Sequence, residues 1–290
     1  MNFGGYLGDQ ELIGSISAGL SNSATSFTVA GSVFGDSAVA GFQPGVVEVG
    51  SELIYVGAVN PSTGVFSNCI RGFRGTTAAT HSANVVVRDH PRIPKIRVIR
   101  ALNETLSTLH PRLYAVATDQ DVLTDWTVFE LPTTCVDVLG VSLVTPDSPE
   151  IWRRSRRWKY VSRAPEVTSG KCIQVFDAWS GCEVHVTYAK RAGTFSEASG
   201  TNEDFATQTG LEEWVREVVV LGASYRIAGY LDAGKIAERT AEGDLLAQQS
   251  PIGQGQKLAG FFYAQFQEAL AAAEVRLRDL NDVGQIHYER

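Results

Sequence analysis

Six basic residues gather in a short stretch near the middle of the chain, with aromatic residues among them. The basic residues are Arg153, Arg154, Arg156, Arg157, Lys159 and Arg163, and the aromatic ones are Trp152, Trp158 and Tyr160. Arginines at this density bind phosphate groups without reading base sequence. The same charges can also stay solvated or pair with an acidic protein, including the acidic C-terminal third of a neighbouring copy. The cluster therefore predicts a contact with DNA or with a protein partner.

Catalytic and metal-binding patterns are missing from the sequence. It contains no GxxxxGK[ST] phosphate loop, no GxGxxG after a strand, no HExxH and no GxSxG, and its histidines are scattered. Asp119, Asp121 and Asp125 could coordinate Ca²⁺, but the stretch lacks the central Gly and terminal Glu of a helix–loop–helix calcium site, which favours turn and helix-cap roles. The sequence predicts no catalytic residue, no metal site and no cofactor. An enzyme such as a cell-wall hydrolase is the least favoured class.

The four cysteines, Cys69, Cys135, Cys172 and Cys182, form no CxxC pair. We expect reduced, buried thiols, since neither a zinc site nor a dense disulfide framework fits this spacing. If any pair were oxidised it would be Cys172 with Cys182, which a hairpin could place opposite one another.

Composition changes near residue 90. Residues 1–90 carry 14 of the 28 glycines but no Trp and no Lys. They count 3 basic against 6 acidic side chains, residues 91–196 count 14 against 11, and residues 197–290 count 8 against 15. The net charge of −7 argues against a surface built throughout to hold nucleic acid, so any DNA contact must be local. Two domains of different construction, 1–90 and 91–290, are predicted.

The chain shows no membrane or export signal. It has no run of 18 apolar residues, and Met1–Gly5 lacks the basic start and apolar stretch of a signal peptide. We therefore expect it to stay soluble inside the cell that makes it, with no membrane partner.

Short β-prone runs alternate with turn residues in the first 90 residues. The runs are 26–29, 46–49, 52–56 and 64–66. Gly50-Ser51 separates two of them by two residues, which is the signature of a type II′ hairpin. A small all-β domain is predicted here.

The remainder alternates between helical and strand periodicity. Apolar residues at spacings of three and four predict a helix at about 93–113, and period-two patterns predict an inserted antiparallel sheet at about 126–190, with 177–181 as the loop of its last hairpin. A capping box at Thr209–Glu212 predicts the start of a long helix, about 209–248, and another follows at about 256–281. The fold class is thus α+β, a small all-β domain followed by a helical bundle with an inserted sheet.

The last helix carries an apolar stripe suited to contact with other subunits. Its residues are Leu258, Phe262, Phe266, Leu270 and Leu277. An amphipathic helix must bury such a stripe against something, so we expect it to form an oligomer or partner contact.

The stretch 70–84, which reads IRGFRGTTAATHSAN, resembles a phrase of the form RGxxGTTAAxH in virion proteins of tailed bacteriophages. In those proteins it follows a strand pair like 52–56. Gly72 and Gly75 allow tight turning, and Ala78 and Ala79 allow close packing. The resemblance implies a phage structural β module.

The order of the remaining elements is similar to that of head-to-tail adaptor (connector, or neck) proteins of tailed phages. It rests on residues 96–113, 129–132 and 222–226, the last reading GASYR on a long helix. The resemblance implies a structural virion protein, made in the host cytoplasm, that forms a homo-oligomeric ring, commonly of twelve copies, under the portal protein. Its C-terminal segment would dock on the portal beside other neck or tail proteins, and its lumen would conduct DNA during genome ejection.

The sequence departs from a minimal adaptor by its N-terminal β domain. That departure keeps a second hypothesis open, in which the chain is a minor tail or baseplate protein whose β domain contacts the host surface.

Overall fold

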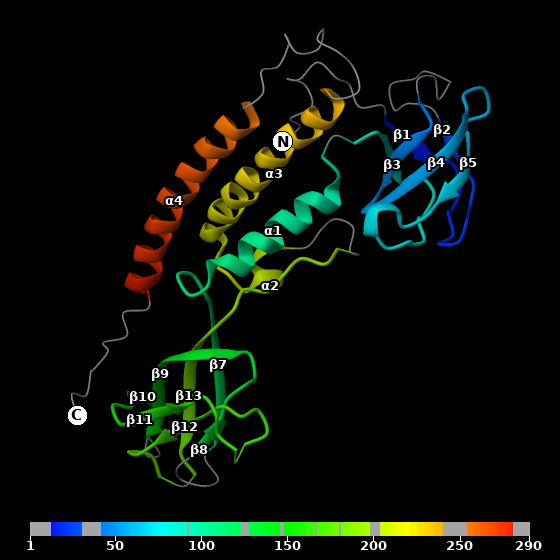
Figure 1. Ribbon diagram of the computed structural model, residues 1–290. Coiled ribbons are helices and arrows are strands. Elements are labelled where there is room, and N and C mark those ends of the chain that lie inside the picture. Colours follow the sequence, from blue (N-terminus) through cyan, green and yellow to red (C-terminus); the bar gives the residue numbers. More distant parts are fainter. Residues whose placement is uncertain are drawn as a thin grey trace. The chain divides into compact units, whose positions relative to one another are not determined.

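The computed structural model describes residues 13–30, 42–91, 93–122, 128–145, 148–165, 167–179, 181–197, 204–239 and 254–280 (Figure 1). The prediction of a mixed α+β chain is confirmed. The chain divides into two compact units, unit 1 being Met1–Leu102 with Phe195–Glu203, and unit 2 being Asn103–Thr194 with Asp204–Arg290. Among the described helices, none is long and apolar enough to cross a membrane.

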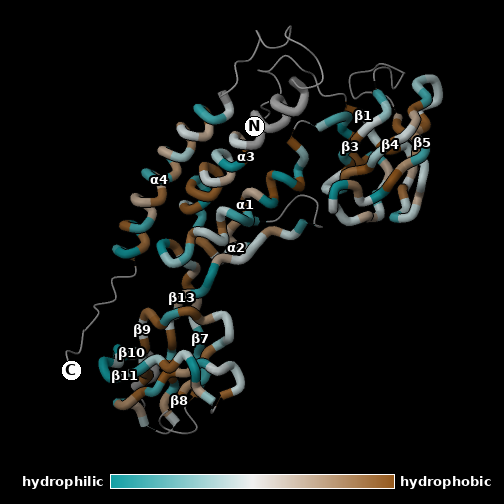
Figure 2. Tube along the Cα trace, viewed as in Figure 1, coloured by the Kyte–Doolittle hydropathy of each residue, from teal (hydrophilic) through white to brown (hydrophobic). Residues whose placement is uncertain are grey.

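Unit 1 contains a closed barrel of six antiparallel strands. They are β1 (Ile13–Ile16), β2 (Phe27–Ala30), β3 (Gly45–Val49), β4 (Glu52–Asn60), β5 (Val65–Ile70) and β6 (Val86–Asp89). Their order is β1-β2-β5-β4-β3-β6, and pairing of β1 with β6 closes the barrel. Closure leaves no unpaired strand edge. The interior is filled by apolar side chains, among them Ile16, Val47, Ile54, Val56 and Phe66, and hydrophobic segments recur along the barrel strands (brown in Figure 2).

The predicted β runs and the Gly50-Ser51 turn are confirmed. Val49 lies opposite Glu52, so two residues join β3 and β4. Gly50 takes φ +62°, the left-handed region that the first central position of such a turn requires.

Unit 1 extends beyond the predicted boundary at residue 90. Helix α1 (Lys95–Leu109) begins against the barrel, where the Lys95 backbone N–H donates to Glu48 Oε1. On the same helix, the Arg100 guanidinium donates to Gly75 O at 3.2 Å and to Glu197 at 3.1 Å. These bonds bind the first half of α1 and the segment around Glu197 to unit 1.

Unit 2 contains two antiparallel sheets instead of the one predicted. The four-stranded sheet has the order β10-β9-β13-β7, and the three-stranded sheet the order β11-β12-β8. The strands are β7 (Ala115–Val122), β8 (Val128–Glu130), β9 (Cys135–Thr145), β10 (Ser148–Arg154), β11 (Trp158–Val161), β12 (Cys172–Val175) and β13 (Glu183–Lys190). Buried residues of both sheets, such as Leu143, Val184 and Ile173, share one core.

The predicted start of the insertion at about residue 126 is wrong, because β7 already begins at Ala115. Trp126 itself lies outside the described residues. The sequence pattern did not predict this strand because its second half, Thr118–Val122, is polar except for Val122 and mostly exposed at the edge of the sheet.

The predicted last hairpin is also wrong. β12 pairs with β11 and β8, whereas β13 pairs with β9 and β7, so 177–181 links two sheets. Cys172 consequently lies opposite Glu130, in the other sheet from the strand that Cys182 precedes. All four cysteines are free and buried, as predicted.

Burial should make these thiols unreactive. It raises the pKa of Cys69 to about 11 and also raises the pKa of Cys135 and of Cys182. Because the thiolate is the reactive form, we expect a thiol reagent to label none of the four in the native protein and all four in denaturant. Intact-mass spectrometry without reductant measures this. A native adduct, or a mass lower by one disulfide, would contradict the expectation.

The predicted capping box at Thr209–Glu212 is wrong. Thr209 ends a short helix, α2 (Phe205–Thr209), which Asp204 caps by accepting from Thr207 N. The Thr209 hydroxyl donates back to Phe205 O at 2.7 Å, and Gly210 takes the left-handed C-cap conformation at φ +69°. The long helix α3 (Arg216–Arg239) starts only after a 3₁₀ turn at Glu213–Val215.

Helix α4 (Gln254–Leu280) matches the last predicted helix within two residues at each end. Residue 281 of that predicted helix lies outside the described residues. Residues 240–248 of the predicted helix before it also lie outside them. α3 and α4 run side by side (Figure 1). Tyr225 of α3 contacts Tyr263 edge-on, with ring centroids 5.4 Å apart, and Phe266 at 5.7 Å.

Candidate functional site

The six basic residues of the predicted cluster lie along the edges of both sheets of unit 2. Arg153 and Arg154 end β10, Arg156 and Arg157 form the link to β11, Lys159 lies on β11, and Arg163 follows it. β10 is an edge strand of the four-stranded sheet and β11 an edge strand of the three-stranded one. All six side chains are exposed. We call this set the arginine edge.

The backbone between the two strands is firmly held. Ser155 is buried, its N–H donates to Val141 O at 2.9 Å, and its hydroxyl donates to Asp177. Phe176 N donates to Arg157 O at 2.7 Å. The arginines therefore project from a fixed link and not from a loose loop.

Most of the positive charge on the arginine edge is unpaired. Arg153 donates to Asp177 O at 3.2 Å and lies 3.9 Å from Asp177 Oδ2. The side chains of the other five form no ion pair or hydrogen bond with any residue in the described part of the chain. Exposed cations without internal partners are available to an external anion.

The three aromatic residues of this stretch have different surroundings. Trp152 is 40% exposed, and its ring packs on that of His185 with centroids 3.6 Å apart. Trp158 and Tyr160 pack against the core of the sheets instead. Burial and the neighbouring Cys135 raise the pKa of Tyr160 to about 12. Only Trp152 is placed to contact a partner together with the arginines.

The predicted contact stripe of α4 is largely internal. Phe266, Leu270 and Leu277 are buried, Phe262 is half-buried and Leu258 is exposed. A helical stripe marks the face that packs without telling whether the packing partner belongs to the same chain. Here α4 packs on α3, and Phe266 contacts Tyr225 of that helix. The large exposed apolar side chains elsewhere on α4 include Phe261 and Val275.

The stretch 70–84 folds around one buried carboxylate, that of Glu52, whose side chain is 1% exposed. Arg71 binds it with two nitrogens, Nε to Oε1 at 2.8 Å and Nη2 to Oε2 at 2.7 Å. His81 Nε2 lies 2.8 Å from Oε2, and the N–H groups of Gly72 and Ala79 donate to the two oxygens. We call this set the Glu52 clamp.

The Glu52 clamp stabilises the ionised carboxylate. Burial alone would raise the pKa of Glu52, but hydrogen bonds from His81, Arg71, Gly72 and Ala79 outweigh it and lower the pKa to about 2. A carboxylate so fully bonded accepts protons poorly, so its role is structural. The sequence pattern could have pointed to Glu52, because it alternates with the inward-facing Ile54 and Val56 along β4.

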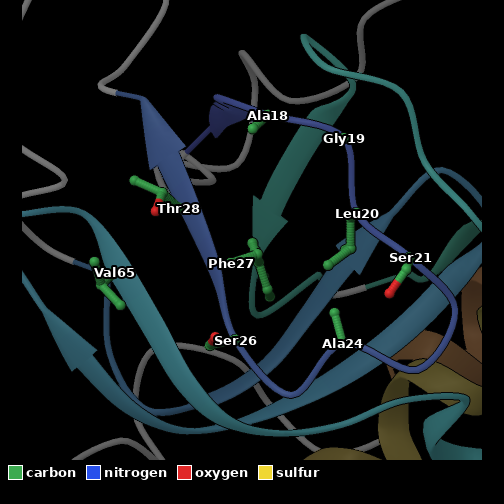
Figure 3. Close-up of a pocket in the computed structure, with 9 residues that line it drawn as sticks. All are labelled: Ala18, Gly19, Leu20, Ser21, Ala24, Ser26, Phe27, Thr28 and Val65. Atoms are coloured by element: carbon green, nitrogen blue, oxygen red, sulfur yellow. The ribbon is translucent and has the colours of Figure 1, made fainter.

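The acidic residues proposed as possible Ca²⁺ ligands do not gather into a site in the described part of the chain. Asp119 and Asp121 lie on β7, where their carboxylates accept from the N–H of the next residue at 3.0 and 2.7 Å, and Asp125 lies outside the described residues. Within the described ranges, no three His, Cys, Asp or Glu residues group to hold a metal. A hollow beside β2, lined by Ala18–Ser21, Ala24, Ser26–Thr28 and Val65 (Figure 3), has no ionisable side chain.

No protein-family model and no curated protein matches the chain. The arginine edge must therefore be interpreted from its own geometry and charge.

Proposed function

We propose that this chain is a structural, non-catalytic virion protein that forms a ring in the neck of a tailed phage, joins the portal to the tail and lets DNA pass. The observation that carries the proposal is the arginine edge, five of whose cations have no anionic partner among the described residues of a chain with net charge −7. A local band of exposed arginine suits transient, sequence-independent contact with passing phosphates. The phrase 70–84 supports a virion origin.

We also propose the architecture that such a protein would have: a barrel followed by a helical bundle into which the two sheets of unit 2 are inserted. Arg226 of α3 supports the bundle by reaching the α1 hydroxyls of Thr105 at 3.1 Å and Thr108 at 3.2 Å, and α4 packs on α3. Long helices offer side surfaces to neighbouring copies, and a ring requires such a heterologous contact to close, commonly after twelve copies in adaptors.

Co-expression with the cognate portal, followed by electron microscopy of the purified complex, tests the proposal. A ring of this protein on the portal is the expected result. A chain that remains monomeric and never binds portal would refute it.

The DNA contact itself is tested by charge reversal on the link between the sheets. We expect the double variant Arg156→Glu, Arg157→Glu to bind duplex DNA more weakly. The slope of log K against the logarithm of the salt concentration should become shallower by about 2, since two phosphate contacts are lost. Arg216→Glu with Arg278→Glu is the matched control, since it changes the net charge equally on residues already paired with Glu213 and Glu274. Equal weakening by both pairs would show that only overall charge matters, and loss of assembly with DNA binding retained would show a protein contact instead.

The tail or baseplate alternative draws on the barrel, whose described core residues all lie between Ile16 and Val87. Under that alternative, an isolated fragment of residues 1–102, which keeps the Lys95 N–H on Glu48, binds host cells. An adaptor fragment does not, so a cell-binding assay on this fragment separates the two functions.

A further inference from the structure

We propose that the four-stranded sheet of unit 2 continues from one copy of the chain into the next, with the β7 edge of one copy paired to the β10 edge of its neighbour. The partner is thus a second copy of this chain, bound head to tail. This pairing would supply one contact between neighbouring subunits of the proposed ring. That a chain of such contacts closes into a ring rests on the proposed function.

Both outer strands of the sheet have an open side. Among the described residues, β7 pairs only with β13, and β10 pairs only with β9. An edge strand presents unpaired N–H and C=O groups that another strand can bind.

Strand direction permits the continuation. All three pairings in the order β10-β9-β13-β7 are antiparallel. Four alternating strands leave β7 and β10 running in opposite directions, so a neighbouring copy in the same orientation places its β10 antiparallel to β7. The joined sheet therefore keeps one hydrogen-bonding pattern throughout.

The two edges carry opposite charge in the same row. The register places Arg153 opposite Leu143, Leu143 opposite Val184, and Val184 opposite Asp121. Directly opposed residues share a face of the sheet, so this row begins with an arginine and ends with an aspartate. Asp119, two residues from Asp121, lies on the same face. Head-to-tail pairing brings these aspartates beside Arg153 of the next copy, whereas pairing of two like edges would oppose like charges.

Exposed apolar side chains lie on the opposite face at both edges. Arg154, Ser142, His185 and Gln120 form the next row. Trp152, two residues before Arg154, shares its face and is 40% exposed. Val122, two residues after Gln120, shares that face too and is 49% exposed. The same pairing thus brings an indole and a valine from different copies onto one surface, where contact would remove both from water.

The contact between copies is short, so the charged side chains must supply much of its stability. The register of β10 shifts between Ser148 and Trp152, so regular pairing on that strand is confined to Trp152–Arg154. In the single chain Arg153 contacts Asp177, and the two aspartates accept from their own strand. Pairing exchanges these local bonds for contacts between copies.

Charge reversal of each edge, separately and together, tests the inference on the full-length, nuclease-treated protein. One variant carries Asp119→Lys and Asp121→Lys, and the other carries Arg153→Glu and Arg154→Glu. In each variant taken alone, the β7 edge and the β10 edge carry charge of the same sign. We therefore expect sedimentation velocity to show self-association at least tenfold weaker than that of the unmodified chain. When the two variants are mixed in equal amounts, each edge can again pair with an edge of opposite charge, so we expect association to return. Circular dichroism confirms that both variants are folded.

The outcomes are separable from those of the ring proposal. Variants that associate like the unmodified chain, or a mixture that stays monomeric, would overturn the edge pairing. A chain that is monomeric at every concentration would overturn it as well. If the mixture is rescued but the unmodified chain never binds portal, the edge pairing stands and the neck function fails.

Discussion

Glu52→Gln is expected to destabilise the barrel of unit 1 by about 3–5 kcal/mol, because it leaves Arg71 buried without its anion. The carboxylate receives two nitrogens of Arg71, His81 and two backbone N–H groups, and it is 1% exposed. The amide that replaces it carries no charge and can accept through only one oxygen. A barrel of this size has little stability to spare, so much of it should be unfolded in the variant.

The same clamp predicts how the barrel responds to acid. The pKa of Glu52 falls from 4.5 to about 2 on folding, a difference worth about 3 kcal/mol. Because the folded pKa is the lower one, this stabilisation is complete above pH 4.5 and is lost as the pH falls toward 2. Glu52→Gln should remove that part of the acid dependence, so that the stabilities of the variant and the unmodified barrel converge as the pH approaches 2.

Tryptophan placement allows the measurement to separate the two units. Every Trp of the chain lies in unit 2, so tryptophan fluorescence reports on unit 2 while hydrogen exchange of the barrel peptides reports on unit 1. We expect Glu52→Gln to increase hydrogen exchange of the barrel peptides and to leave the tryptophan fluorescence of unit 2 unchanged. Glu197→Gln is the matched control, because Glu197 pairs with Arg100 in unit 1 but both side chains are nearly half exposed. Such pairs contribute about 0–1 kcal/mol. Equal effects of the two variants would contradict the structural role of the clamp.

Local chemistry explains which parts of the fold were predictable. The β runs of the barrel and the Gly50-Ser51 turn depend on neighbours within a few residues, and both were predicted correctly. The Glu52 clamp was not predicted, since its partners lie 19 to 29 residues away and only the closed barrel brings them together. The strand β7 was missed because an exposed edge loses the apolar alternation that marks a strand.

The candidate site was predictable in composition but not in arrangement. The density of arginine at 153–163 is visible in the sequence, whereas its distribution over the edges of two sheets depends on the pairing of β10 with β9 and of β11 with β12. The charge row that ends at Asp121 depends on the same registers. The stripe of α4 shows a related limit, because its periodicity marks Phe266 and Leu270, which are buried, but could not show that Phe266 packs on Tyr225 of α3.

Gly222 of α3 lies close to both α1 and α4. A Cβ added there would lie 2.3 Å from Thr105 Cγ2 and 3.0 Å from Phe266 Cε2. Thr105 is fully buried, and its hydroxyl accepts from Arg226 Nε at 3.1 Å, so its side chain cannot rotate away without losing that bond. Gly222 and Arg226 both belong to the GASYR stretch of the long helix, and the two act on the same threonine of α1.

Gly222→Leu should therefore destabilise unit 2 by about 3 kcal/mol, and Gly222→Ala by about 1–2 kcal/mol, measured by urea unfolding followed through tryptophan fluorescence. Gly229→Ala on the same helix is the matched control, since nothing lies within 4 Å of its added Cβ and helix propensity alone should stabilise by about 0.5–1 kcal/mol. Thr105→Ser removes the opposing methyl and keeps the hydroxyl for Arg226. Combined with Gly222→Ala, it should recover most of the loss, with a coupling of about 1 kcal/mol. If the two losses simply add, the methyl is not the obstacle, and the packing of α1 on α3 must be held by other contacts.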